Sequence, residues 1–277
     1  MNQEVLFKAL HRHLKFRNPN HLLKIPSNFL PGPEQSQAAE KYLAGLYEKG
    51  ISWTHPGHFH YPAQFLKMKE PPLFLEYKGE PFWQSHPCLA VVGARKIHTL
   101  SENWMNQQLG HYLKMQDVCI VSGGAYGVDQ QAHLLSVKNE KPTIVIVPSG
   151  LIDLYPKNLT QVFKFLNPEL VTFLSEFENH QVLHKSHFFY RNRLIAALGE
   201  MTLIIQAEIK SGSLLTVHHA LENGRPVLTL PAHPSLTGFS GNIKLLQDGA
   251  YLISSSLDLL EFWNGEIRSS KCQFNLS

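Results

Sequence analysis

Short apolar runs alternate with amphipathic segments through most of this chain, from residue 88 to residue 263. Each run is nearly continuous in apolar residues, which is typical of strands buried on both faces of a sheet. The runs cover residues 88–94, 118–124, 142–147, 170–176, 201–208, 225–230 and 250–255. The helical segments between them cover residues 99–115, 127–138, 158–166, 189–199, 211–223, 240–248 and 256–263. This alternation predicts an α/β fold with an extended Rossmann-like, doubly wound, mostly parallel sheet.

The first 85 residues follow a different pattern. They predict two helices, at residues 4–16 and 34–49, and then a proline-rich stretch with short strands at 51–54 and 73–77. The cations of the first helix are Lys8, Arg12, Lys15 and Arg17. We expect these cations to form a solvated face rather than a binding surface. The chain therefore divides into an N-terminal helical cap (1–50), a loop-rich extension (51–85), the Rossmann-like main domain (86–265) and a C-terminal tail (266–277).

The composition supports an ordinary folded core. Hydrophobic residues make up 43% of the chain and charged residues 17%, a mixture that excludes a disordered protein. No apolar run approaches the roughly 20 residues that a bilayer-spanning helix needs. The N-terminal residues also lack the pattern of a secretory signal, so we expect no membrane contact and a cytoplasmic location.

Cysteine and histidine spacing argues against a disulfide framework and against a metal site. The three cysteines, Cys88, Cys119 and Cys272, have no paired spacing, and two of them lie in or beside predicted core strands. We therefore expect reduced, buried thiols. The chain has 16 histidines, but neighbouring pairs such as His218 and His219 lack the i, i+4 spacing of a helical metal pair.

Glycine and small polar residues recur where the predicted strands end. They occur at Gly93–Arg95, Ser122–Gly127, Ser149–Gly150 and Ser211–Ser213. In an open parallel sheet these loops share the edge formed by the carboxyl ends of the strands, where ligands bind. Glycine lets the backbone approach a phosphate closely, and the first N–H groups of the following helix point at such a ligand. Four such loops on one edge predict an extended anion-binding crevice.

The loops do not match the common nucleotide-cofactor sites. A dinucleotide site needs G-x-G-x-x-G after the first strand and an acidic residue that holds the ribose. Here the first strand of the main domain ends in GARK, and no carboxylate is in place for the ribose. The P-loop string G-x-x-x-x-G-K-[ST] does not occur. We therefore predict neither NAD nor ATP chemistry and no other cofactor.

Residues 184–193 combine aromatic side chains with cations in the string HKSHFFYRNR. They lie between the fourth strand of the main domain and a predicted helix, hence near the same edge of the sheet. Aromatic faces for bases beside cations for phosphates are what sequence-tolerant binding of single strands requires. One of the two rings, Phe188 or Phe189, is expected to pack in the core instead.

Together these strings resemble the DprA/Smf family, the DNA-processing factors of bacterial natural transformation. The matching strings are VVGAR (91–95), SGGAYGVDQQAH (122–133), PSGLIDLYPKN (148–158), LSEF (174–177), FFYRNRLIAAL (188–198), SGSLLTVHHALENGRPVLTLPA (211–232) and SGNIKLLQDGA (240–250). Their order and spacing agree with the family over residues 50–255. The chain departs from the family pattern at Tyr126, where an arginine is usual, so the crevice lacks one expected cation.

The resemblance implies a homodimeric mediator, without catalytic residues, that binds and protects single-stranded DNA and helps load the RecA recombinase during natural transformation. It assigns DNA binding to the main domain, with Arg95 as the cation after its first strand. Lys185 and Phe188 resemble the cation and the stacking ring of the DNA pocket, and Arg191 and Arg193 would support them. The other matching family positions are Ser122, Gly123, Gly124 and Ala125 in the phosphate-cradling loop, and Asn192, Ser211, Gly212, Ser213 and Asn242 around the pocket.

Two other functions stay open from the sequence. One is a Rossmann-type nucleotide-processing hydrolase similar to phosphoribohydrolases, although the loop SGGAYGVDQQ lacks their threonine and catalytic glutamate. Glu176 and Glu208 end predicted strands at the ligand edge and are the candidate bases, but we expect both to be solvated. The other alternative is a small-nucleotide sensor that binds a signalling ligand without DNA.

Overall fold

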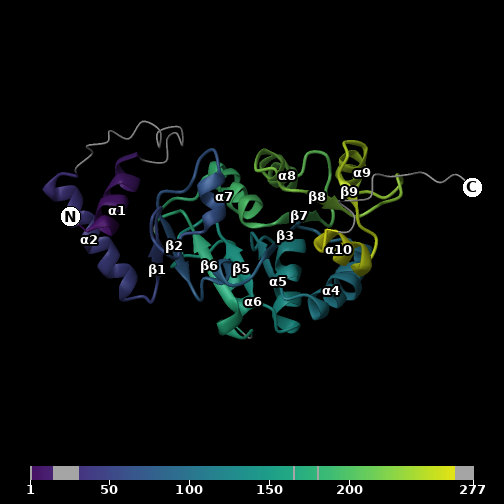
Figure 1. Ribbon diagram of the computed structural model, residues 1–277, viewed down its shortest axis with the longest axis horizontal. Helices are drawn as coiled ribbons and strands as arrows, with labels where there is room; N and C mark the ends of the chain where they lie inside the picture. The colour runs from purple at the N-terminus through teal and green to yellow at the C-terminus, as the bar shows by residue number, and fades with distance from the viewer. Residues whose placement is uncertain (1, 15–30, 165, 180, 266–277) are drawn as a thin grey trace, which may run out of the picture.

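The computed structural model describes residues 2–14, 31–164, 166–179 and 181–265, and its centre is one nine-stranded sheet (Figure 1). The strands are β1 (Ser52–Thr54), β2 (Leu75–Lys78), β3 (Cys88–Val92), β4 (Cys119–Ser122), β5 (Thr143–Ile146), β6 (Val171–Ser175), β7 (Met201–Ile204), β8 (Val227–Thr229) and β9 (Tyr251–Leu252). They follow the order β1-β2-β6-β5-β4-β3-β7-β8-β9. Strands β3 to β9 pair in parallel, whereas β2 pairs antiparallel with β6 and β1 pairs antiparallel with β2. The predicted fold class is confirmed.

The strand order reverses at the pair β3 and β7. From β3 the chain proceeds through β4 and β5 to β6 on one side, whereas β7, β8 and β9 extend the sheet on the other side. The register places Val92 opposite Ile204, so both strands end at the same level. The loops that follow β3 and β7 therefore leave neighbouring strands in opposite directions, which is where open α/β sheets bind ligands.

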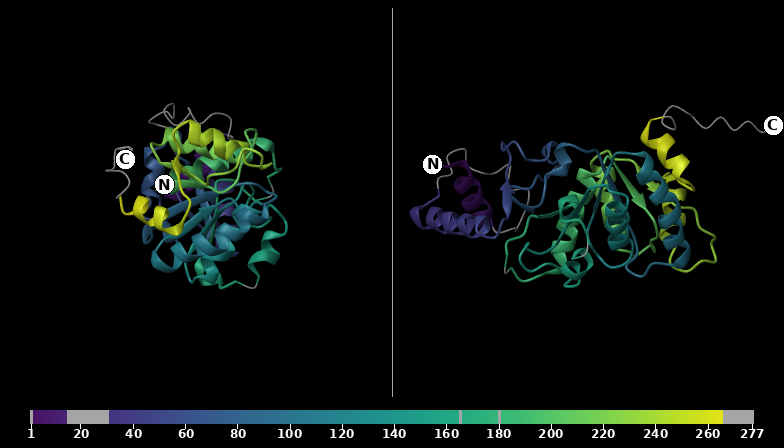
Figure 2. Two further views of the ribbon diagram at one scale, coloured as in Figure 1. Left: turned by 90° about the vertical axis from the view of Figure 1, so that its right-hand side faces the viewer. Right: turned by 90° about the horizontal axis from the view of Figure 1, so that it is seen from below.

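Helices cover both faces of the sheet (Figures 1 and 2). The helices of the main domain are α3 (Thr99–Trp104), a π-helical turn (Met105–Leu109), α4 (Gly110–Met115), α5 (Val128–Lys138), α6 (Leu159–Phe163), α7 (Lys185–Leu198), α8 (Ser213–Glu222), α9 (Ser240–Gln247) and α10 (Ser256–Trp263). Alternate strand residues face opposite sides. Ala90 accordingly packs with Leu194 of α7, and Leu89 packs in the core formed with α4, α5 and α10. No helix among the described residues has both the length and the apolar character needed to cross a bilayer.

Helix α7 begins four residues earlier than the sequence pattern predicts, at Lys185 instead of 189. The reason is its buried face, which carries His187, Arg191, Leu194 and Leu198 at helical spacing. Two of these four residues are polar, so the apolar period at the start of the helix is weak. The string of aromatic residues and cations is therefore the first two turns of a helix and not a connecting loop.

The two core cysteines lie where the sequence predicts. Cys88 and Cys119 are buried, free thiols that face each other as register partners on β3 and β4. Cys272 lies outside the described residues.

The N-terminal helices α1 (Gln3–Leu14) and α2 (Pro33–Tyr47) pack at the β1–β2 end of the sheet (Figure 1). The extension adds β1, β2 and two 3₁₀ turns, Ala63–Lys67 and Phe82–Gln84; a third such turn, Pro168–Leu170, precedes β6. Extension and main domain thus share one sheet, because β2 pairs with β6.

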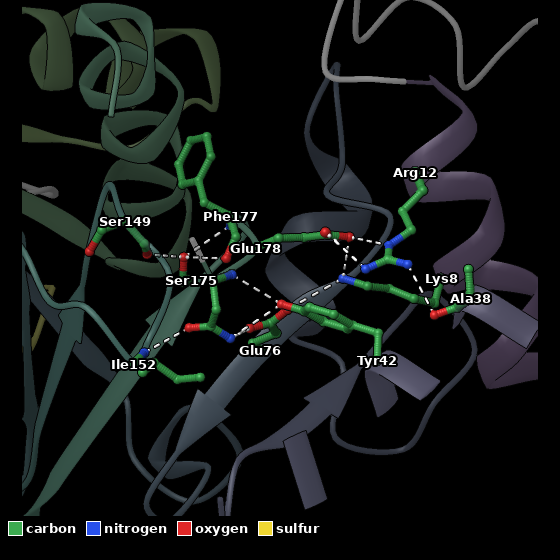
Figure 3. A network of polar contacts seen from close by, with 11 residues as sticks. Lys8, Arg12, Ala38, Tyr42, Glu76, Ser149, Ile152, Ser175, Phe177 and Glu178 are labelled. Carbon is green, nitrogen blue, oxygen red and sulfur yellow. Dashed lines mark hydrogen bonds and ion pairs between the residues drawn. The ribbon is translucent and has the colours of Figure 1, made fainter. Parts of the chain in front are cut away.

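The prediction of a solvated cationic face on the first helix is wrong for Lys8. Its side chain is fully buried, and its ammonium lies 3.3 Å from Glu76 and 3.0 Å from Glu178 (Figure 3). Arg12 also bonds to Glu178, at 2.8 Å. Burial lowers the pKa of Lys8, and the two carboxylates oppose this shift. Burial would raise the pKa of Glu178, but the bonds from Arg12 and Lys8 outweigh it and bring the pKa to about 2. Lys15 and Arg17 lie outside the described residues.

A Lys8→Met substitution should therefore destabilise the protein strongly. It leaves Glu76, 2% exposed, without its buried cation, and breaking a buried pair on one side costs about 3–5 kcal/mol. Urea denaturation should show this loss in the free energy of unfolding. Lys41→Met removes an exposed cation from α2 and should change stability by less than about 0.5 kcal/mol. Equal urea midpoints for the two variants would contradict the assignment of Lys8 as the buried partner of Glu76.

Candidate nucleic-acid interface

A small pocket opens at the carboxyl ends of β3, β4 and β5. It is lined by Arg95, Gly123, Ala125, Tyr126, Pro148, Tyr155, Pro156, Phe188 and Arg191, and we call it the stacking pocket. The first and second glycine loops both contribute to it, together with the chain after β5 and the start of α7. The convergence of these segments follows from the parallel order of the strands, which places their carboxyl ends on one edge.

Two glycines allow the backbone to pass close to its neighbours here. A Cβ atom at Gly123 would lie 2.0 Å from the guanidinium of Arg191. Gly127 has φ of +78°, and a Cβ atom there would lie 2.4 Å from the carbonyl oxygen of Ala94. The N–H of Val128 donates to that same carbonyl at 3.1 Å. The first and second loops are therefore packed directly against each other.

Arg191 holds this edge together from inside the protein. Its side chain is 5% exposed, and one guanidinium nitrogen donates to the backbone carbonyls of Gly123 and Ile146. Burial lowers the pKa of Arg191 to about 10, while the nearby Asp129 acts in the opposite direction. The resemblance implies that Arg191 supports Lys185 and Phe188 in the DNA pocket. Two of its nitrogens bond within the protein, and part of the side chain lines the pocket, so its role toward DNA stays a prediction.

Asp129 is a residue of this site that the sequence analysis missed. It is buried in the first turn of α5 and accepts a hydrogen bond from the N–H of Ala125 at 3.3 Å. Burial raises its pKa to about 6, although Arg191 and the loop donors favour the carboxylate. The signal was present in the sequence, because Asp129 stands in the matching string SGGAYGVDQQAH.

Part of the expected phosphate loop therefore makes hydrogen bonds to other parts of the protein. The Ser122 hydroxyl donates to the carbonyl of Val91 at 2.6 Å, and Ala125 donates to Asp129. Gly124 adopts φ of +67° and turns the loop. The loop shapes the floor of the stacking pocket, and its available chemistry comes from the side chains around it.

Arg95 and Phe188 meet at the mouth of the stacking pocket. The Arg95 side chain is exposed, and its guanidinium carbon lies 5.8 Å from the centre of the Phe188 ring. The half-buried Phe188 ring also contacts Tyr155 edge-on, with centroids 5.6 Å apart. Exposed Tyr126, at the position of the expected arginine, lines the same pocket. Cation and aromatic surfaces are thus combined in one open site.

Lys185 and Phe189 flank this arrangement on α7. Lys185 is exposed and precedes Phe188 by three residues, so the two lie on the same side of the helix. Phe189 is 39% exposed and contacts His219. The expectation that one of the two phenylalanines packs in the core is wrong, since neither is fully buried.

Arg193 lies outside the stacking pocket. It is buried, donates to the carbonyl of Glu70 at 2.7 Å and pairs closely with Glu176. The prediction of a solvated Glu176 is therefore wrong, because Glu176 is buried against Arg193. The supporting role of Arg193 in DNA binding stays a prediction, and the structure places this side chain inside the fold. Glu208 is exposed, as expected.

The residues after β7 tie the loops to one another. Ser213 donates to the carbonyl of Gly93 at 2.8 Å, and the Asn192 amide donates to Gly212 at 3.3 Å. The Ser211 hydroxyl accepts from the N–H of Ser213 at 3.2 Å. Asn242 is fully buried and bonds to the backbone of Ala207 and Ile205. These residues shape the edge, and Asn242 does so without reaching its surface.

The third glycine loop faces the N-terminal cap as well as the pocket. Pro148 lines the stacking pocket, but a Cβ atom at Gly150 would lie 2.5 Å from the backbone of Asn179. Asn179 accepts from the N–H of Ile152 at 2.7 Å and donates to Glu76 at 3.2 Å (Figure 3). The wall of the pocket is thereby joined to the charged network beneath the cap.

Tyr155 and Pro156 also belong to the pocket but were not among the predicted site residues. They stand in the matching string PSGLIDLYPKN. Their side chains reach the pocket only because the chain after β5 folds back toward α7, a placement that no local pattern encodes.

Comparison with known proteins shows the family of this chain. The family model for DNA recombination-mediator protein A matches residues 52–264. The DNA processing protein DprA of Streptococcus pneumoniae is 34% identical over 202 residues, which cover 72% of this chain and 70% of that protein. Protein Smf of Escherichia coli is 30% identical over 235 residues, which cover 82% of this chain and 63% of that protein.

Solved structures indicate the same family. The crystal structure of Streptococcus pneumoniae DprA superposes with a TM-score of 0.72 at 28% identity, covering 93% of this chain and 92% of that one. The structure of Helicobacter pylori DNA processing protein A, described for its single-stranded DNA binding mode, gives a TM-score of 0.66 at 29% identity, with 78% and 96% covered. This chain belongs to the DprA/Smf family, that of DNA recombination-mediator protein A.

Proposed function

We propose that this protein binds single-stranded DNA at the stacking pocket and acts on it as a mediator, without catalysing a reaction. One observation carries the proposal: an exposed cation and an accessible aromatic ring, Arg95 and Phe188, meet at an open pocket on the ligand edge of the sheet. This is the pairing that sequence-tolerant single-strand binding uses. The relative from Helicobacter pylori is described as binding single-stranded DNA.

In this mechanism a base stacks on the ring of Phe188, and its flanking phosphates meet Arg95 and Lys185. The exposed ring of Tyr126 offers a second stacking surface at the same mouth. Paired bases cannot present their faces, so a duplex should bind more weakly. A salt-titrated comparison of a dT oligomer with a matched duplex tests the ligand class. Equal affinities for the two would refute the preference for single strands.

The site removes one of the two candidate bases of the hydrolase alternative and leaves Glu208 exposed. Glu176, one candidate base, is buried in an ion pair with Arg193 and has no access to a ligand in the stacking pocket. Incubating the protein with nucleoside monophosphates should release no free base, as followed by chromatography. Release of free base would overturn the non-catalytic assignment.

Family membership further supports a homodimer in the cytoplasm that protects incoming DNA and helps load RecA during transformation. Loading should appear as faster RecA filament formation on single strands already coated with a single-strand-binding protein. An unchanged rate would remove this part of the proposal and leave DNA binding untouched.

Phe188→Ala should weaken binding through lost stacking. Each base stack contributes about 1–3 kcal/mol, so the dissociation constant for a dT oligomer should rise roughly 5- to 150-fold. Fluorescence anisotropy measures this change. The salt dependence should stay as it is, because the ring carries no charge.

Arg95→Ala should weaken binding in a different way, by removing a phosphate contact. The slope of log affinity against log salt should flatten by about 0.7 for each lost contact with a single strand. Lys138→Ala is the matched control, since this exposed cation ends α5 at the opposite edge of the sheet. If Arg95→Ala and Lys138→Ala gave the same slope, Arg95 would not be a DNA contact.

A further inference from the structure

A second and larger pocket, of about 490 Å³, lies beside the stacking pocket. It is formed by the chain after β3, Ala94–His98, by the chain after β7, and by Thr237 and Gly238. We call it the switch-point pocket, because β3 and β7 are the neighbouring strands at which the sheet order reverses. Its volume is in the range of small-ligand sites.

The rim of the switch-point pocket is cationic. Arg95, Lys96 and Lys210 line it with exposed side chains. Within the described part of the chain, none of the three forms an ion pair. Their charge is therefore available to an anion. Glu208 also lines the pocket, so the surface offers a hydrogen-bond acceptor next to the cations.

Gln206 supplies a hydrogen-bond donor on the wall of the pocket. Its side chain is 5% exposed, and its Oε1 accepts from the N–H of His98 at 2.8 Å. Its Nε2 atom has no partner among the described residues. A Cβ atom built at Gly238, another residue of the pocket lining, would lie 2.9 Å from this nitrogen, so the Nε2 atom is on the pocket side of the residue. Gln206 can thus donate a hydrogen bond to a ligand in the switch-point pocket.

We propose that the switch-point pocket binds a nucleotide. The phosphate would meet Arg95, Lys96 and Lys210, an amino or hydroxyl group of the base or sugar would donate to Glu208, and Gln206 would donate to an oxygen of the ligand. Glu208 disfavours a bare phosphate, because a carboxylate repels an anion that offers it no hydrogen.

The nucleotide has two possible sources, and one residue connects them. Arg95 lines both pockets, so a strand held at the stacking pocket would reach the switch-point pocket with its next unit. This form of the proposal rests on the proposed function. The other source is a free mononucleotide with the same phosphate and base chemistry.

The test uses the full chain with Lys96 and Lys210 both changed to alanine, two exposed positions whose loss should not disturb folding. Oligo-dA strands of increasing length are titrated by anisotropy, and dAMP is titrated by calorimetry. Adenine is chosen because its amino group can face Glu208. Lys114 and Lys138, two exposed cations at the ends of α4 and α5, are both changed to alanine as the control for the loss of two charges.

If the next unit of the strand binds, the double variant should lose at least tenfold affinity for long strands and keep its affinity for the shortest strand that binds. If a free mononucleotide binds, dAMP should bind the unmodified protein, and the affinity of the double variant for dAMP should be at least tenfold lower. Unchanged affinities in both titrations would overturn the proposal. Phe188→Ala distinguishes failure of the proposed function from failure of this inference. It changes the stacking pocket alone and leaves the switch-point pocket intact.

Discussion

The ligand edge of this protein depends on one buried cation. The guanidinium of Arg191 joins the glycine loop after β4 to the end of β5 and lies near the buried Asp129. A charge in this position is costly unless it is paired and hydrogen-bonded, so the segments that surround it are held in place. Because Arg191 belongs to α7, the same contacts set the position of Phe188, one turn earlier, at the mouth of the stacking pocket.

The helical period of α7 then divides its basic and aromatic side chains into two groups. Arg191 and Arg193 face inward, where they bond to backbone carbonyls and Arg193 also pairs with Glu176. Lys185 and Phe189 face outward. Cations that are close in the sequence therefore have different positions, because Arg191 and Arg193 bond within the fold whereas Lys185 is exposed to solvent.

Charges also organise the β1–β2 end of the sheet, beneath the N-terminal cap. Lys8 and Glu76 are buried together, and Tyr42 donates to the same carboxylate at 2.7 Å. Asn179 connects this network to Ile152, in the loop that continues from the pocket wall (Figure 3). The N-terminal cap is thus attached to the chain segment that contributes Pro148 and Tyr155 to the stacking pocket.

The sequence alone determined the fold class, the order of strands and helices in the main domain, and the edge that carries the loops, because apolar period and glycine position are local properties. The motif strings also singled out Arg95 and Phe188, which the structure brings together at the stacking pocket. The tertiary structure decided which charges are exposed, since the burial of Lys8, Arg193 and Glu176 depends on partners 68, 17 and 17 residues away. It decided too that Tyr155 and Gln206 line pockets, because such placements arise only when distant strands meet at one edge.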